Sequence, residues 1–114
     1  MISSSEFIKG YTKIIICSYL FRSPDYLYNI VKKIIKDGEG YIQISNPSAL
    51  MVMKELEREE FVSSYIEISE QNQARKYYKL TDKGKEFYLS NYSEYVKSLK
   101  IWLCHNKWLI FDEK

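Results

Sequence analysis

A run of large apolar side chains near the C-terminus, spaced alternately four and three residues apart, most constrains the fold. The run, termed the seam below, consists of Tyr88, Tyr92, Tyr95, Leu99 and Trp102. This spacing is typical of a helix that packs lengthwise against another helix. Further apolar residues lie off the seam, so the helix carries more apolar surface than one domain of 114 residues can cover. We expect the seam to form a homodimer interface, with packing against the N-terminal helix as the alternative.

Three shorter helices are expected upstream. Apolar residues recur with a period of 3.6 from Glu6 to Phe21, which predicts the first. Ser23-Pro24 predicts the start of the second, with serine as cap and proline in the first turn, and the sequence 37–40 ends it. Asn46-Pro47 repeats the cap-then-proline signal for a third helix that runs to about Glu60.

The 3.6-residue helical period also predicts which residues of the second and third helices face inward. The residues expected in the core are Leu27, Ile30, Val31, Ile34, Ile35, Ala49, Val52, Met53 and Leu56.

A β-hairpin is expected after the third helix. Phe61–Ile68 and Arg75–Leu80 read as strands, and the polar residues between them are too few for anything but a hairpin tip. Alternation puts Val62, Ile66 and Ile68 on one face, and Tyr78 and Leu80 in the core. Thr81-Asp82 then caps the long last helix.

One further short strand is expected at 41–44. The chain is thus predicted to be mainly helical with a small β-hairpin, an α+β fold. Residues 1–81 are expected to form one domain, and residues 82–114 a C-terminal dimerisation helix.

Composition argues against several classes of protein. The longest apolar run, Ile14–Cys17, is far shorter than the roughly 20 residues that span a bilayer. Cys17, Cys104 and His105 are too few for a structural zinc site, and none of the four glycines lies in a phosphate-binding loop. No nucleophile stands near a base. We expect a cytoplasmic protein that is not an enzyme and has no metal, no cofactor and no membrane segment.

The expected order of three helices, a hairpin and a long helix is that of a winged helix-turn-helix module, in which the second and third helices read DNA and the hairpin is the wing. The net charge is +2 over residues 1–40, −4 over 41–74 and +4 over 75–114. The acidic middle segment opposes phosphate binding. It supports a rival interpretation, a winged helix that has become a protein-interaction or dimerisation module without sequence-specific DNA binding.

Three stretches carry a family resemblance over about residues 10–103. Pro24–Ile34, Asn46–Leu56 and Arg75–Gly84 resemble the second helix, the recognition helix and the basic-Tyr-Tyr-Leu-Thr-Gly stretch of the PadR-like bacterial transcriptional regulators, in their short form. The family usually has glycine where Glu60 stands and tyrosine where Leu50 stands. The resemblance implies a homodimeric repressor that binds double-stranded DNA at an inverted-repeat operator.

Candidate DNA contacts follow from this placement. Asn46 and Ser48 are expected at base edges or phosphate, with helix capping as the alternative, and Lys54 at the groove or phosphate. The lysines of the second helix are equally compatible with a solvated face. The full set is Tyr26, Tyr28, Lys32, Lys33, Asn46, Ser48, Leu50, Lys54, Gln73, Arg75 and Lys76, with Gln71 and Asn72 at the wing tip.

A second candidate site lies on the C-terminal helix. Some short PadR-like proteins bind planar aromatic or drug-like molecules near the dimer interface. By resemblance, Tyr95, Trp102 and Trp108 are expected to line a cleft for a small aromatic effector, because flat rings stack on flat ligands. The alternative is that these rings pack as part of the interface itself.

Overall fold

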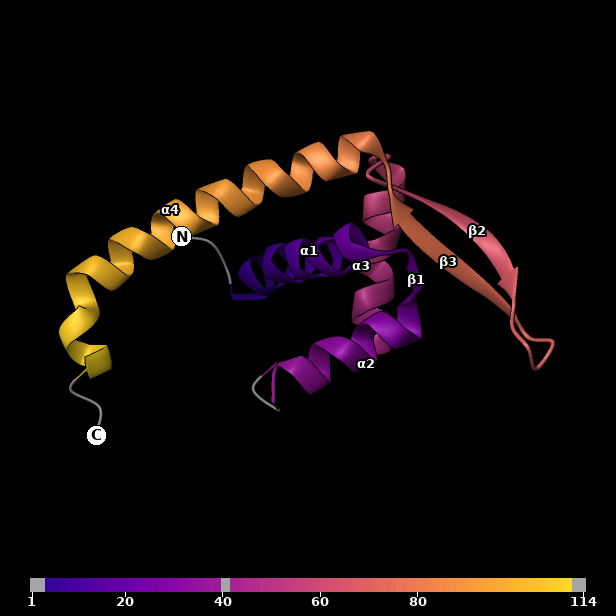
Figure 1. The fold of residues 1–114 in the computed structure, drawn as a ribbon, viewed down its shortest axis with the longest axis horizontal. Coiled ribbons are helices and arrows are strands. Elements are labelled where there is room, and N and C mark those ends of the chain that lie inside the picture. Colours follow the sequence, from indigo (N-terminus) through magenta and orange to yellow (C-terminus); the bar gives the residue numbers. More distant parts are fainter. Residues whose placement is uncertain (1–3, 40–41, 112–114) are drawn as a thin grey trace.

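A computed structural model describes the backbone of residues 4–39 and 42–111 and the side chains of residues 10–39 and 42–105. Figure 1 shows the helical core, with the long last helix running past it and a hairpin projecting away. The fold is α+β, as predicted. The elements in order are α1 (Ser4–Arg22), β1 (Asp25–Tyr26), α2 (Leu27–Asp37), α3 (Asn46–Arg58), β2 (Val62–Ile68), β3 (Ala74–Leu80) and α4 (Asp82–Phe111).

The sheet has three antiparallel strands in the order β1-β3-β2, rather than the two of the expected hairpin. β2 and β3 pair along their whole length, from Val62 opposite Leu80 to Ile68 opposite Ala74. The two residues of β1 pair with the other edge of β3, with Tyr26 opposite Tyr77. The hairpin is thereby joined directly to the segment that precedes α2.

The predicted start of α2 is wrong by several residues. Ser23 and Pro24 lie before β1, and the N-cap is Tyr26, in extended conformation. The reason is Asp25, whose buried carboxylate accepts hydrogen bonds from the Tyr26 backbone N–H (2.8 Å) and the Asn29 amide. These contacts favour an extended chain that pairs with β3 before the helix begins.

The start of α3 is shifted by one position from the prediction. Ser45, not Asn46, is the N-cap, and its hydroxyl accepts a hydrogen bond from the Ser48 backbone N–H at 3.2 Å. Residues 42–45 before it form no strand, and Tyr41 lies outside the described residues.

α3 ends at Arg58 in a tight turn. Glu60 has a φ of 65°, the left-handed conformation that favours glycine, and the Phe61 N–H closes the turn on the Leu56 carbonyl at 2.9 Å. The Phe61 carbonyl in turn faces Gly84 of α4 so closely that a Cβ there would lie 1.9 Å from the oxygen. The start of α4 is therefore packed directly on the turn between α3 and the wing.

The core confirms most of the predicted set. Its buried residues are Ile16, Cys17, Leu20, Ile30, Val31, Ile34, Ala49, Val52, Met53, Leu56, Val62, Tyr78 and Leu80, with Leu27 partly buried against them. Ile35 is exposed, contrary to prediction. Ile66 and Ile68, which share a face with Val62, are 64% and 66% exposed, because the hairpin projects beyond the helices (Figure 1).

The seam on α4 divides into two parts. Tyr88 packs on Phe21 of α1, with ring centroids 5.1 Å apart, so the alternative of packing within the chain holds for this first position. Tyr92, Tyr95, Leu99 and Trp102 are all about half exposed or more. Most of the seam therefore remains accessible on the single chain.

Candidate nucleic-acid interface

Helix α3 is amphipathic along its length, with one face in the core and the other in solvent. Ala49, Val52, Met53 and Leu56 are buried, and the opposite face is exposed. Four predicted contacts share that exposed side, namely Asn46, Ser48, Leu50 and Lys54. A helix that shows its N-terminal residues to solvent beside a hairpin has the geometry to enter a major groove.

The capping alternative for Asn46 is wrong, because Ser45 is the cap and Asn46 is the first helical residue. The Asn46 side chain is exposed. The Ser48 side chain is less available to an outside partner, because its hydroxyl accepts a hydrogen bond from the Ser45 hydroxyl at 2.9 Å.

Met51 was missed by the sequence analysis. Its side chain is 68% exposed and is the most exposed large apolar group in the described part of the chain. Its position four residues after Pro47 and three before Lys54 places it on the solvent-facing side, a signal that helical spacing alone carries. Met51 and Leu50 together give the exposed face of α3 an apolar patch.

The two lysines predicted on α2 differ in their surroundings. Lys32 is exposed, whereas the Lys33 ammonium lies 2.9 Å from the buried Asp25 carboxylate. Tyr28, at the start of α2, is 63% exposed. Lys32 and Tyr28 are thus the groups on α2 that are best placed for an outside partner.

The wing carries cations that are held by neighbouring side chains. The Arg75 guanidinium lies 4.6 Å above the Tyr26 ring and donates a hydrogen bond to its hydroxyl at 3.2 Å. Lys76 lies 3.6 Å from Glu57 of α3. These contacts fix both cations in the tip-side half of the hairpin, where Arg75 lies opposite Glu67 and Lys76 opposite Ile66. The rings of Tyr26, Tyr77 and Tyr65 form a row across the three strands beside them.

The tip of the wing is shaped by its own hydrogen bonds. The Ser69 N–H donates to the Gln73 carbonyl, and the Asn72 N–H donates to the Ser69 carbonyl, both at 2.9 Å. Asn72 has a positive φ of 60°, which asparagine tolerates better than most residues. Gln71, Asn72 and Gln73 all have exposed side chains.

Several acidic groups of the middle segment are paired with cations of the same chain. Lys13 of α1, which the sequence analysis did not single out, lies 2.7 Å from Glu59 and 3.8 Å from Glu55. Glu57 also pairs with Lys76 and accepts a hydrogen bond from Ser64 at 3.1 Å. The net charge of −4 therefore overstates the negative charge offered to an outside partner.

The predicted effector residues occupy α4. Tyr95 and Trp102 are exposed and lie two helical turns apart on one face, and the Trp108 side chain lies outside the described set. Among the described residues, no three of His, Cys, Asp and Glu gather in a way that could hold a metal ion. Within the same ranges, no helix has the length and apolarity needed to cross a membrane.

An exposed recognition-type helix, a helical core and a hairpin wing together define a winged helix-turn-helix protein. The model of the family described as "Transcriptional regulator PadR-like family" matches residues 16–89, and the chain belongs to this family of transcriptional regulators. Among curated proteins, no relative matches the sequence.

Solved structures agree with this assignment. A transcriptional regulator from Clostridium thermocellum is 29% identical with a TM-score of 0.74, over 89% of this chain and 94% of its own. A PadR family regulator from Clostridium difficile is 28% identical with a TM-score of 0.71, over 87% of this chain and 98% of its own. Bacillus subtilis PadR in complex with operator DNA shares the fold at 22% identity and a TM-score of 0.62, over 68% of this chain and 44% of its own.

Proposed function

We propose that this PadR-like regulator binds an inverted-repeat operator as a homodimer and represses transcription. The observation that carries the proposal is the exposed face of α3, with Asn46, Leu50, Met51 and Lys54 turned toward solvent. Repression needs only that the bound dimer cover its DNA site. The operator complex of Bacillus subtilis PadR gives a precedent for the fold.

The chemistry of the α3 face suits the edges of bases in the major groove. An asparagine amide pairs with adenine at two positions, and lysine donates to guanine or phosphate. Leu50 and Met51 have no donor or acceptor suited to a base edge, but they offer apolar surface to the methyl group of thymine. We therefore expect the half-site to contain thymine where these two side chains meet the groove.

Backbone contacts are assigned to α2 and the wing. Lys32 and Tyr28 supply an exposed cation and an exposed hydroxyl on α2, and on the wing the half-buried Arg75 supplies a guanidinium and Gln73 an exposed amide. Lys33 and Lys76, both paired with carboxylates, and Tyr26, which accepts from Arg75, act mainly by holding these elements in position.

The dimer is assigned to α4. In this division residues 1–81 form the reading head and residues 82–114 the dimerisation helix, with Tyr92, Tyr95, Leu99 and Trp102 facing the second copy. Two heads held by such a helix pair would read half-sites about 34 Å apart, one turn of B-DNA. An aromatic effector at Tyr95, Trp102 and Trp108 would then bind where the two helices meet.

Selection of bound sequences from a random DNA library tests the proposal. We expect an inverted repeat with half-sites about one helical turn apart, and sedimentation of a dimer at micromolar concentration. Binding should also weaken steeply between about 50 and 200 mM salt, as phosphate contacts require. A library without enrichment, or an interaction that is insensitive to salt, would instead support the rival protein-interaction module.

A further inference from the structure

The residues that open α4 are bound to the turn that ends α3, at the point where α4 leaves the core (Figure 1). We term this contact the joint, and it comprises residues 59–61 and 81–87. Three consecutive carbonyl oxygens of the turn, those of Glu59, Glu60 and Phe61, accept hydrogen bonds across it. The donors are, in the same order, the Lys83 ammonium (3.0 Å), the Thr81 hydroxyl (2.7 Å) and the Thr81 backbone N–H (3.0 Å).

Aromatic rings and cations hold the same joint. Phe61 and Phe87 are stacked, with ring centroids 4.3 Å apart. The Lys83 ammonium lies 5.3 Å from the centroid of the Phe61 ring. Lys13 of α1 lies 5.4 Å from the centroid of the Phe87 ring and pairs with Glu59 at 2.7 Å. The end of α3, the start of α4 and α1 are therefore held together at one place.

Gly84 permits the close approach within the joint. It is the one buried residue of α4 among those whose side chains the structure describes. A Cβ at this position would lie 1.9 Å from the Phe61 carbonyl oxygen, whereas Cβ contacts shorter than 3.0 Å are essentially never observed. Alanine is the better helix former, so the contact rather than the helix requires glycine here. An alanine would have to separate α4 from the turn by about 1 Å.

The α4 side of the joint is the side that can move. The turn is closed on α3 by the 2.9 Å hydrogen bond from the Phe61 N–H to the Leu56 carbonyl, and the buried Val62 follows it directly. Beyond the contact of Tyr88 with α1, by contrast, none of residues 89–105 is buried. A displacement forced at the joint is therefore absorbed by α4.

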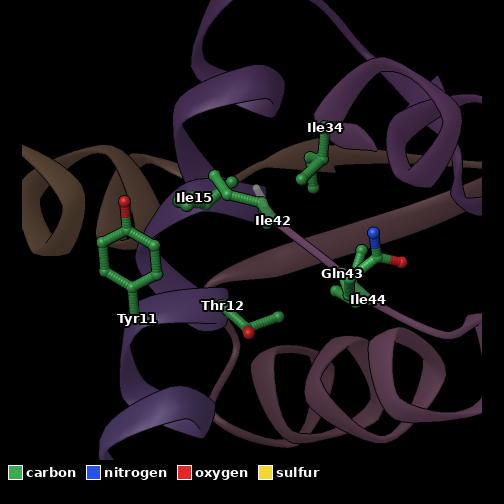
Figure 2. A pocket seen from close by; sticks show the side chains of 7 residues that line it. All are labelled: Tyr11, Thr12, Ile15, Ile34, Ile42, Gln43 and Ile44. Carbon is green, nitrogen blue, oxygen red and sulfur yellow. The ribbon is translucent and has the colours of Figure 1, made fainter. Parts of the chain in front are cut away.

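Free volume in the reading head lies elsewhere. A cavity of about 240 Å³ opens between α1, α2 and the segment that leads into α3, and Figure 2 shows the side chains that line it. None of these residues belongs to the joint. The empty space of this cavity is thus not available to a Cβ at Gly84.

A small tilt at the joint grows along α4. If Tyr88, about 6 Å from Gly84 along the helix, stays in place while the start of α4 moves by about 1 Å, the helix tilts by about 10°. Cys104 lies about 24 Å beyond Tyr88 and would move by about 4 Å relative to the reading head. In the proposed dimer the second head is attached through the seam, so the same tilt changes the separation of the two α3 helices.

We propose that the joint sets the separation of the half-sites that the dimer accepts, and that Gly84 is the positioning residue that fixes it. This inference rests on the proposed function, since it requires a dimer joined through α4. One base pair more or less moves a half-site by about 3.4 Å and turns it by about 34° around the duplex. We expect the unmodified chain to bind its preferred separation at least about tenfold more tightly, a loss comparable to that of one good base contact.

The joint is tested without DNA by a distance within one chain. Spin labels at Met51→Cys on α3 and at the exposed Cys104 on α4 report it by double electron–electron resonance, in samples diluted with unlabelled chains, while Cys17 is buried. The unmodified joint should give one narrow distance distribution. Gly84→Ala should shift its maximum by about 2 Å or more. Gly10→Ala is the matched control, because a Cβ there meets nothing within 4 Å, and should leave the distribution unchanged.

Operators whose half-sites are moved by single base pairs test the effect on DNA. The unmodified chain and Gly10→Ala should share one preferred separation, and Gly84→Ala should prefer a different one with an unchanged dimer dissociation constant. A broad label distance in the unmodified chain, an unchanged distance in Gly84→Ala, or an unchanged preferred separation would each overturn the proposal.

Thr81→Val provides a second variant in case Gly84→Ala does not fold. It removes the hydroxyl that donates to the Glu60 carbonyl and accepts from the Gly84 N–H at 3.0 Å, but it keeps the backbone hydrogen bond to Phe61. Loosening without displacement should broaden both the label distances and the range of accepted separations around the same optimum. Thr81→Ser should restore both, and a Thr81→Val variant as selective as the unmodified chain would contradict the proposal.

The outcomes separate this proposal from the proposed function. A chain that selects an inverted repeat, but whose Gly84→Ala variant keeps the same separation, refutes this proposal alone. A chain that selects no DNA refutes the proposed function and with it the role in half-site separation, and the label distances then still report whether Gly84 fixes the direction of α4.

Discussion

The Lys33 ammonium nitrogen lies 2.9 Å from the carboxylate of Asp25, which is the one buried charged residue in the described part of the chain. The same carboxylate accepts hydrogen bonds from the Tyr26 backbone and the Asn29 amide, so it joins β1 to α2. Lys33 therefore balances a buried negative charge, while its neighbour Lys32 is exposed. Two adjacent lysines thus have different expected roles.

Neutralising each lysine in turn should separate these roles. Lys32→Gln should weaken operator binding and lower the slope of log affinity against log salt by about 0.9 per protomer, with unchanged stability. Lys33→Gln should lower the free energy of unfolding by about 1 kcal/mol, because the buried Asp25 carboxylate loses a cation that is itself half exposed. It should change the salt slope less than Lys32→Gln does, because Lys33 is already paired within the chain. Equal salt slopes for the two variants would refute the assignment.

Thymine contacts by Leu50 and Met51 can be tested on the DNA itself. Replacing a contacted thymine of the selected operator by deoxyuridine removes only the methyl group, and burial of one such group contributes about 0.8 kcal/mol. We expect about a fourfold loss of affinity at that position. In Leu50→Ala or Met51→Ala the same replacement should have little effect, and a loss that persists in both would argue against these contacts.

The seam predicts that a charge at its centre prevents dimerisation. Leu99→Glu would bury an unpaired carboxylate from each copy and should raise the dimer dissociation constant by at least about a hundredfold, as measured by sedimentation. Ile101→Glu is the matched control, since Ile101 is at least as accessible as Leu99 but lies off the seam. Dissociation by both variants, or by neither, would contradict the assigned interface.

The two cysteines should differ in reactivity. Burial raises the pKa of the Cys17 thiol to about 12, so little thiolate forms there, whereas Cys104 is exposed on α4. A thiol reagent at pH 8 should modify one group rapidly, and Cys104→Ser should abolish that fast phase. Rapid modification of the Cys104→Ser variant would show that Cys17 is accessible.

The raised pKa of Cys17 also determines how the free energy of unfolding changes with pH. The folded state favours the neutral thiol, so its contribution to stability is complete below pH 9 and is lost as the pH rises toward 12. Chemical denaturation across this window should show a smaller loss of stability for Cys17→Ala than for the unmodified chain.

The left-handed conformation of Glu60 predicts a stabilising substitution. Glu60→Gly removes the steric cost of a positive φ and should raise the free energy of unfolding by up to about 1 kcal/mol, after the greater flexibility of glycine in the unfolded chain is counted. Glu60→Ala keeps the unfavourable conformation and should be close to neutral. A lower stability for the glycine variant, measured by denaturant titration, would show that the Glu60 side chain matters more than the backbone.

The helical periodicity predicted the inward face of α3 correctly, because burial of Ala49, Val52, Met53 and Leu56 follows directly from the spacing of apolar residues. It failed at Pro24, where the cap-and-proline signal is overridden by the hydrogen bonds of Asp25 and by pairing with β3. The hydrogen bonds of Asp25 are local, but the strand pairing that accompanies them places Asp25 opposite the distant Tyr78, and no local pattern reports that pairing.

The wing illustrates a second limit. Alternation correctly placed Val62 and Ile66 on one face of β2, but it says nothing about how far the core extends beneath that face. The net charge of −4 over residues 41–74 was misleading about the charge offered to a partner for a similar reason. Lys13, which neutralises Glu59, is distant from it in the sequence. The exposure of Met51 is predictable from the sequence, because helical spacing assigns residues to the outer face of α3 as well as to the inner one.

The contact between Arg75 and Tyr26 has a mechanical consequence. Tyr26 is both the last residue of β1 and the cap of α2, so the guanidinium that stacks on it couples the hairpin to α2, while the contact between Lys76 and Glu57 couples it to α3. In the proposed complex, a displacement of the wing by the DNA backbone would therefore reach α2, with its exposed Lys32 and Tyr28, through the ring of Tyr26.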